Sequence, residues 1–349
     1  TFFGRQFLYK SPYEWLMNLF GFIGVRALVR FAMLAIFALL VAVALAFDRL
    51  RLHPDRRRVI AAAAIVGILV DGWAAPLTLA AVPDMWPWPA DYSFGPVLEL
   101  PLMTDYGDFV AMYRTTRHRH PSINGHSGFF APHYTALQFA LERGDAAAFD
   151  AFRGSDPLLV VVDKRADSSG RWEALVRRAR GATVVSSDER WTLVGIPALP
   201  TEAPCIGSKL AIASAADVSG PIDTTVLLDR DPRTWWVSAL AQHAGDTVNV
   251  GLGQTARVCA VRMSLGTSWW VYPRLLTVET SLDTANWTQA FRDSTAGLMI
   301  RGLIEEPRDA WVTVPVRTAE ARFIRLRLES SDDSVPWLIS ELEILGAPR

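Results

Sequence analysis

The chain lacks several features that would assign it to a common class. Its 349 residues carry 35 basic and 36 acidic side chains, so it has no excess positive charge for binding nucleic acid. Lysine is nearly absent: Lys10, Lys164 and Lys209 are the only three, and the other basic residues are arginine, a bias typical of a GC-rich bacterial genome. No methionine begins the chain, so we expect a fragment or a processed product.

Two long hydrophobic runs lie near the N-terminus instead. Residues 31–47 carry no charge, and extension back to residue 27 gives the roughly 20 residues that cross a bilayer. The second run is rich in alanine and contains Asp71, which either faces neighbouring helices or ends a shorter span. We therefore predict transmembrane helices at about 27–47 and about 59–82.

The segment between the two runs indicates their orientation. Residues 48–58 contain five arginines and two aspartates, and such short basic loops lie in the cytoplasm. Residues after about 83 would then be extracytoplasmic, and the chain would belong to the bacterial inner (plasma) membrane.

The segment before the first run mixes aromatic residues with arginine. We predict an interfacial helix at about 11–26, which completes a membrane segment over residues 1–92. Arg26 and Arg30 are four residues apart and so share one helical face. Both binding of a lipid phosphate and simple anchoring at the interface are open for this pair.

Residues 93–199 alternate between strand-like and helix-like patterns, which predicts a small α/β domain. Its stretch 114–134 holds four of the six histidines together with three arginines. No metal-binding or catalytic spacing accompanies them. Contact with a phosphate or a sugar and packing as a surface loop are both open.

The first 199 residues also resemble a known group of proteins. The motifs SPYEWL, GVRALVRFAML, VLELPL, MYRTTRHRHPSINGHSGFFAPHY and PLLVVVDKR are similar to the C-terminal part of bacterial polytopic membrane proteins. Those proteins are grouped with GT-C-type glycosyltransferases, which use lipid-linked sugars. The resemblance implies that the catalytic carboxylate lies upstream of this chain, so no catalytic residue is assigned here.

Residues 203–349 show short alternating runs separated by turn residues, which predicts an all-β sandwich or jelly roll. Five motifs in order, LLDRDPRTWW, GDTVNVGLG, YPRLLTVETSLDTANW, ARFIRLRL and WLISELEILG, resemble the discoidin fold. That group includes the coagulation-factor type C domains and related carbohydrate-binding modules. The chain departs from its pattern at Arg230 and Gly251, where glycine and aspartate are usual.

The discoidin resemblance implies a structural calcium ion. The residues at the matching positions and nearby are Asp229, Asp231, Thr234 and Glu341. Their oxygen-only side chains suit Ca²⁺. Turn capping by Asp229 and Asp231 without a metal is the alternative.

A carbohydrate-binding face is predicted from aromatic residues that gather in one loop. The candidate residues are Trp269, Trp270, Tyr272, Arg274, His243 and Trp337. Aromatic rings would contact the C–H faces of a sugar, and the polar side chains would bind its hydroxyls. Packing in the scaffold, or docking of the loop onto the membrane or the middle domain, is the alternative.

The chain contains only two cysteines, Cys205 and Cys259, and both lie in the C-terminal segment. A disulfide between them is permitted outside the cytoplasm, and two buried free thiols are the alternative.

These observations predict a multidomain chain: two transmembrane helices, an α/β domain and a discoidin-like sandwich. The first functional hypothesis is the C-terminal region of an envelope glycosyltransferase-like protein whose sandwich binds envelope glycan or a lipid-linked sugar. The second is a non-enzymatic, membrane-tethered adhesion or scaffold protein that recognises envelope glycan or a protein partner. Neither involves nucleic acid.

Overall fold

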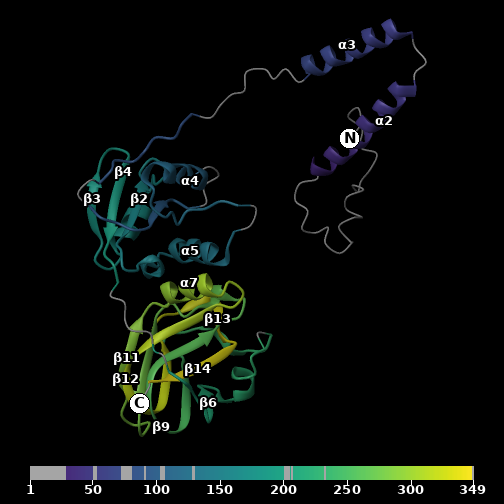
Figure 1. Ribbon diagram of the computed structural model, residues 1–349. Coiled ribbons are helices and arrows are strands. Elements are labelled where there is room, and N and C mark those ends of the chain that lie inside the picture. Colours follow the sequence, from purple (N-terminus) through teal and green to yellow (C-terminus); the bar gives the residue numbers. More distant parts are fainter. Residues whose placement is uncertain are drawn as a thin grey trace. The chain divides into compact units, whose positions relative to one another are not determined.

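The computed structural model describes residues 29–49, 53–71, 81–89, 92–102, 107–127, 130–199, 205, 207–231 and 233–347. The chain forms two compact units, which divide between Ala81 and Val82 (Figure 1). The predicted boundaries within the second unit, at 93–199 and 203–349, stay predictions.

The first unit contains two helices, α2 (Val29–Arg49) and α3 (Pro54–Asp71). Near the connection between them, the guanidinium of Arg57 donates a 3.1 Å hydrogen bond to Asp48 and lies over the ring of Phe47. Most of the apolar side chains described for these helices are exposed within this unit.

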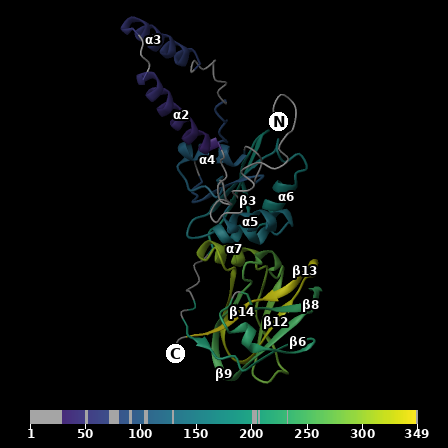
Figure 2. The same cartoon turned by 90° about the vertical axis from the view of Figure 1, so that its right-hand side faces the viewer.

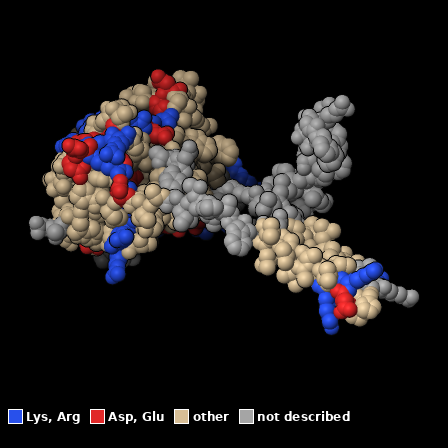
Figure 3. Space-filling model, turned by 90° about the horizontal axis from the view of Figure 1, so that it is seen from above, with Lys and Arg blue, Asp and Glu red and all other residues tan. Residues whose placement is uncertain are grey.

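The prediction of two transmembrane helices is wrong for the described residues, because none of their helices combines the length and the apolar character that a bilayer crossing requires. The apolar run of α2 is limited by Arg30 and Asp48, and α3 ends at Asp71. Figure 3 shows charged side chains gathered at one end of these helices. The predicted interfacial helix at 11–26, and with it Arg26, lies outside the described residues, as does the side chain of Arg30.

The second unit begins with a four-stranded sheet of order β1-β2-β4-β3. Strand β1 (Val97–Leu100) runs parallel to β2 (Leu158–Asp163), so the connection between them must cross over the sheet. This connection contains the helical segments α4 (Gly107–His118), α5 (Pro132–Glu142) and η2 (Ala146–Phe152). Helix α6 (Arg171–Arg177) and the antiparallel strands β3 (Thr183–Ser187) and β4 (Trp191–Ile196) complete this part, which we call the α/β half.

The arginine- and histidine-rich stretch contributes to the interior of the α/β half. Arg114 and His118 on α4 are buried. The guanidinium of Arg114 pairs with the buried carboxylate of Glu99 on β1 and donates a 2.8 Å hydrogen bond to the carbonyl of Asp84. Asn124 is also buried, and it exchanges hydrogen bonds with the backbone of Glu99. The polar groups of Arg114 and Asn124 are therefore hydrogen-bonded within the α/β half.

The C-terminal part is a β-sandwich, and the expectation of an all-β architecture for it is confirmed. Its larger sheet has the order β11-β10-β12-β9-β14-β5, with β6 joined to β9 and β7, and its smaller sheet pairs β13 with β8. The bounds are β5 (Lys209–Leu210), β6 (Ser214–Asp217), β7 (Gly220–Ile222), β8 (Trp236–Gln242), β9 (Thr247–Ser264), β10 (Leu276–Ser281), β11 (Thr288–Asp293), β12 (Trp311–Leu328), β13 (Asp332–Ile339) and β14 (Glu341–Gly346). Two single-turn segments, η3 (Thr224–Leu227) and η4 (Trp269–Val271), lie between strands.

The sandwich also contains a helix that the sequence patterns did not predict, α7 (Ala296–Glu305). It lies between the strands of the sandwich and helix α5 (Figures 1 and 2). Gly297 brings α7 close to η2, since a Cβ there would lie 2.6 Å from the carbonyl oxygen of Ala147. The two halves of this unit therefore pack directly on each other through α7.

Candidate functional site

The loop predicted to bind sugar is docked against the α/β half. Tyr272 is fully buried, and its hydroxyl donates a hydrogen bond of 3.3 Å to Asp145. The ring of Trp269 meets that of Phe139 on α5 edge to face, with centroids 5.3 Å apart. Burial, together with the charge of Asp145, raises the pKa of the Tyr272 hydroxyl. These two rings join the halves, and the buried ring of Tyr272 leaves no face for a ligand.

Arg274 is likewise occupied within the protein. Its guanidinium makes two hydrogen bonds to Asp332, of 3.0 and 2.8 Å, and lies 4.0 Å from the centroid of the Tyr272 ring. It also donates to the carbonyl of Trp270. Of the predicted aromatic loop, Trp270 alone keeps a substantially exposed ring, at 41%.

The other two predicted residues, Trp337 and His243, lie together in a different place. Trp337 on β13 is fully buried, and Trp236 on β8 packs across it at 78° with centroids 5.6 Å apart. His243 is exposed directly after β8. Both residues line a shallow pocket in the sandwich. The six predicted residues are thus divided between the junction of the two halves and this pocket.

We call this hollow the Trp236 pocket. Its lining residues are Asp217, Val218, Ser219, Trp236, Ser238, Ala239, Leu240, His243, Asp246, Thr247 and Trp337. Its volume is about 100 Å³, whereas sites that enclose a small molecule have volumes of several hundred Å³. It therefore suits one face or edge of a single ring of a larger ligand.

The acidic wall of the pocket is fixed by the β6–β7 hairpin. One oxygen of Asp217 accepts hydrogen bonds from the backbone of Ser219 (2.7 Å) and Gly220 (3.0 Å), which closes the turn. Gly220 has a φ of 137°, which favours glycine. The second oxygen of Asp217 accepts from the indole N–H of Trp236 at 3.2 Å, so the turn also orients the ring.

The turn after β8 also lines the pocket. Nδ1 of His243 lies 2.6 Å from the carbonyl of Ala241, so it carries the hydrogen and Nε2 of the neutral ring is an acceptor. The backbone N–H of His243 donates to Asp246 at 3.0 Å. An indole ring, an imidazole and two carboxylates thus converge on one pocket.

Two exposed apolar side chains line the pocket beside these polar groups. Leu240 is 72% exposed and Val218 is 74% exposed. Large exposed apolar side chains that gather in one place mark interaction sites. Trp236, Asp217 and Asp246 were not among the residues predicted to bind sugar. The signal for Trp236 was the Trp-Trp pair at the start of a strand, where neighbouring side chains point to opposite faces.

The predicted calcium ligands come together only in part. The hydroxyl of Thr234 donates to both oxygens of Asp229, at 2.9 and 2.8 Å. Asp229 is also close to Glu341: burial and this neighbouring carboxylate raise the pKa of Glu341, and its Oε1 is buried without a hydrogen-bond partner. Asp231 turns away and binds Arg233 at 2.7 Å. In the described ranges, no three His, Cys, Asp or Glu side chains form a group able to hold a metal.

These contacts test how well a calcium ion would fit. Asp229, Thr234 and Glu341 offer oxygen ligands. A cation between the two carboxylates would offset the cost of burying the negative charge of Glu341 next to Asp229. Arg230 adopts a φ of 58°, so the arginine takes up the left-handed conformation for which the resembling family uses glycine. Three of the four predicted residues therefore fit a cation, and Asp231 does not.

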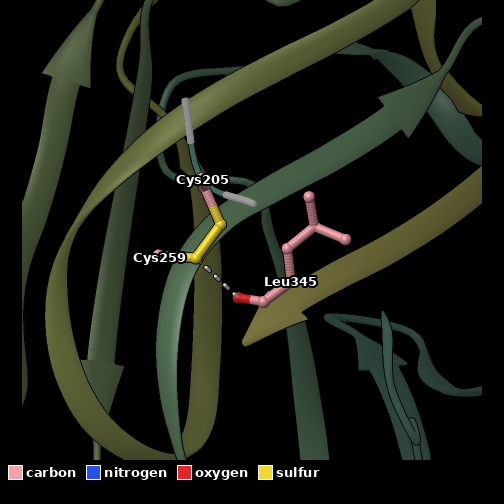
Figure 4. Close-up of a disulfide and its surroundings, with 3 residues drawn as sticks. All are labelled: Cys205, Cys259 and Leu345. Carbon is pink, nitrogen blue, oxygen red and sulfur yellow. Dashed lines mark hydrogen bonds between the residues drawn. A yellow bond between two sulfur atoms is a disulfide. The ribbon is translucent and has the colours of Figure 1, made fainter. Parts of the chain in front are cut away.

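Cys205 and Cys259 form a disulfide, with 5.7 Å between their Cα atoms (Figure 4). It links the segment before β5 to strand β9, and Sγ of Cys259 lies 3.6 Å from the carbonyl oxygen of Leu345 on β14. The bridge therefore ties the start of the sandwich to its larger sheet.

Comparison with known proteins gives matches in structure alone. No family model matches the chain, and no curated protein matches it. One similar structure is the CBM32 of AlyQ in complex with 4,5-unsaturated mannuronic acid, which is 16% identical to this chain and has a TM-score of 0.30. The match covers 40% of this chain and 99% of the AlyQ module. Another is the C-terminal domain of a chitobiase from Bacteroides fragilis, which is 17% identical and has a TM-score of 0.31. The match covers 40% of this chain and 98% of the chitobiase domain.

A longer structure, truncated AlyQ with CBM32 and alginate lyase domains, has 15% identity and a TM-score of 0.32 over 41% of this chain. This chain spans only 34% of that one. The likenesses concern the C-terminal region and give no support to the resemblance of residues 1–199 to membrane glycosyltransferases. At these identities and TM-scores they carry no functional argument.

Proposed function

We propose that the β-sandwich binds carbohydrate in the Trp236 pocket. The observation that carries this proposal is the convergence of the Trp236 ring, His243, Asp217 and Asp246 on one shallow hollow. A sugar ring presents C–H faces that pack on an indole, and hydroxyls that donate to carboxylates and to an imidazole nitrogen. A hollow of this size would bind one ring of a polysaccharide.

Carbohydrate-binding modules occur among the similar structures, and they agree with this proposal without carrying it. One is the CBM32 of AlyQ, and another is the chitosan-binding module 1 of a Paenibacillus chitosanase/glucanase. We propose an envelope glycan as the partner of this chain.

A glycan array probed with the intact chain tests the proposal. Trp236→Ala and His243→Ala should each lower the binding signal about tenfold, because each removes a wall of the pocket. The matched control is Trp235→Ala, which removes a neighbouring exposed indole that does not line the pocket. A thermal melt of each variant checks that Trp337 stays packed.

A second variant distinguishes this pocket from the loop that the sequence favoured. Trp270→Ala removes the exposed ring of that loop and should leave glycan binding unchanged. Loss of binding in Trp270→Ala with retention in His243→Ala would contradict the Trp236 pocket and restore the loop. Absence of any glycan signal for the wild-type chain would contradict the proposed function.

We also propose that the sandwich works outside the cytoplasm. The Cys205–Cys259 disulfide supports this, because such bridges persist in oxidising compartments. Labelling of intact cells with a thiol reagent before and after reduction tests it. The cysteines should become reactive only after reduction, and labelling without a reductant would contradict the proposal.

The wider context of glycan binding stays a prediction. The resemblance of residues 1–199 is the sole support for a glycosyltransferase that uses lipid-linked sugars, and an adhesion or scaffold protein would need the same sandwich. An assay of sugar transfer in cells that express the intact gene separates the two: transfer supports the enzyme, and its absence favours the scaffold.

A structural calcium ion is proposed for the same sandwich, at Asp229, Thr234 and Glu341. The unpartnered Oε1 of Glu341 supports this proposal. When bound, calcium would join η3 and the loop after it to strand β14 and thereby stabilise the sandwich.

A further inference from the structure

A groove lies between the α/β half and the sandwich, apart from the Trp236 pocket. Its volume is about 540 Å³, within the range of sites that hold small molecules. The α/β half contributes Asp150 of η2 and Arg180, which follows α6. The sandwich contributes Asp293 of β11, Arg301 of α7 and Arg317 of β12. Both halves are therefore needed to form it.

The residues that line the groove carry a net positive charge, with three arginines against two aspartates. Arg180 pairs with Asp293. Among the described residues, the Asp150 carboxylate pairs with Arg153, while Arg301 donates to the backbone carbonyls of Asp150 at 3.0 Å and Arg153 at 3.4 Å and forms no ion pair. Arg317 is exposed and forms no ion pair within the described part of the chain. The guanidinium groups of Arg301 and Arg317 thus have no carboxylate partner within the described part of the chain and can still pair with an anion.

The rest of the groove surface is largely apolar. Phe291, Leu298, Pro315 and Val316 line it next to the hydroxyl-bearing Thr318. Apolar side chains next to hydrogen-bonding groups form the usual surroundings of a bound organic molecule rather than of a bare ion. The ligand should therefore combine an anionic group with an apolar face.

We propose that this groove binds an acidic saccharide through the carboxylate of one pyranose ring. The planar guanidinium groups of Arg301 and Arg317 match a carboxylate in shape and charge. The Phe291 side would contact the C–H face of the same ring. This second site takes a charged sugar, whereas the Trp236 pocket offers carboxylates to neutral hydroxyls. It does not depend on the function proposed for that pocket.

Isothermal titration calorimetry with the intact chain tests the proposal, with trigalacturonate as the acidic probe and maltotriose as the neutral one. Trigalacturonate should bind, and Arg317→Ala should raise its Kd about tenfold, because one charge-assisted hydrogen bond is lost. Arg317→Lys should restore part of the affinity. Arg308→Ala, which removes an exposed arginine outside the groove, is the matched control and should leave the Kd unchanged.

Two further titrations give outcomes that overturn the proposal. If inorganic phosphate binds as tightly as trigalacturonate and competes with it, the groove is a simple anion site. If Trp236→Ala abolishes trigalacturonate binding and Arg317→Ala does not, the ligand binds in the Trp236 pocket. Equal binding of the acidic and neutral probes, or no binding of trigalacturonate, also contradicts an acidic-saccharide site in the groove.

Discussion

Tyr272 of the sandwich donates its hydroxyl hydrogen to the carboxylate of Asp145, which begins helix η2 in the α/β half. The same Asp145 oxygen accepts from the hydroxyl of Ser294 at 2.7 Å, and the other oxygen caps η2 by accepting from the backbone of Ala147 at 3.1 Å. One partly buried carboxylate therefore caps a helix in one half and accepts hydrogen bonds from two hydroxyls of the other. We expect this arrangement to couple the unfolding of the two halves.

Asp145→Ala should lower the free energy of unfolding by about 2 kcal/mol, because it removes a cap and leaves two hydroxyls without an acceptor. Urea unfolding, followed by both tryptophan fluorescence and far-UV circular dichroism, measures the change. We expect coincident transitions in the wild-type chain and separated ones in the variant.

Asp156→Ala is the control, since Asp156 is an exposed aspartate of the same half away from the junction. It should change the unfolding free energy by less than about 0.5 kcal/mol. Equal effects of the two substitutions would show that Asp145 does not couple the halves.

Gly297→Ala should separate α7 from η2. The added Cβ would lie 2.6 Å from the carbonyl oxygen of Ala147, a backbone atom that cannot simply rotate away. Overpacking of this kind costs about 2 kcal/mol. Thermal unfolding measures it against Gly154→Ala, where a Cβ meets nothing within 4 Å. An unchanged Tm for Gly297→Ala would mean that the junction yields easily.

The sequence predicted the sandwich better than it predicted the site. Alternating apolar residues and turn signals are local features, and they indicated the all-β class of residues 203–349 and its strands β9, β10, β12 and β14. Helix α7 was missed because Gly297 and Gly302 lower its intrinsic helix propensity. Both glycines are needed for close packing, since a Cβ on Gly302 would lie 1.9 Å from the carbonyl oxygen of Trp311.

The site was harder to predict because its geometry depends on distant partners. Tyr272 and Asp145 are 127 residues apart, so no local pattern shows that the aromatic loop docks instead of binding a ligand. His243 and Trp337 were predicted from residue type and line the Trp236 pocket, yet the turn at Asp217 that orients Trp236 carried no signal of its own. The apolar run of α2 shows the opposite error, since composition alone favoured a bilayer span.

Acid should destabilise the α/β half through His118. Burial, together with the neighbouring His120 and Arg114, lowers the pKa of His118 from 6.5 to about 4. Between pH 6.5 and about 4, His118 is protonated in the unfolded chain but neutral in the folded chain. The folding stability therefore falls as the pH is lowered through this range. The loss should be about 3 kcal/mol over this range.

His118→Asn keeps an acceptor for the backbone N–H of His120, which bonds to Nδ1 of His118 at 3.0 Å. Urea unfolding at several pH values should give a flatter dependence for this variant than for the wild type. His243→Asn, which removes an exposed histidine, should keep the wild-type slope. A slope that His118→Asn leaves unaltered would show that His118 takes up its proton in the folded state as readily as in the unfolded one.

Calcium should stabilise the sandwich through Glu341. An ion bound to the folded state alone raises its stability, and for a unit of this size a gain of 1 kcal/mol corresponds to about 3 °C in Tm. Differential scanning calorimetry in excess Ca²⁺ and in EDTA should show this shift for the wild type and not for Glu341→Gln, which removes the charge on the buried side chain. Glu320→Gln removes an exposed carboxylate on a different strand, β12, and should keep the full shift. A wild-type Tm that is the same in both buffers would leave Asp229 and Thr234 as a capped turn without a metal.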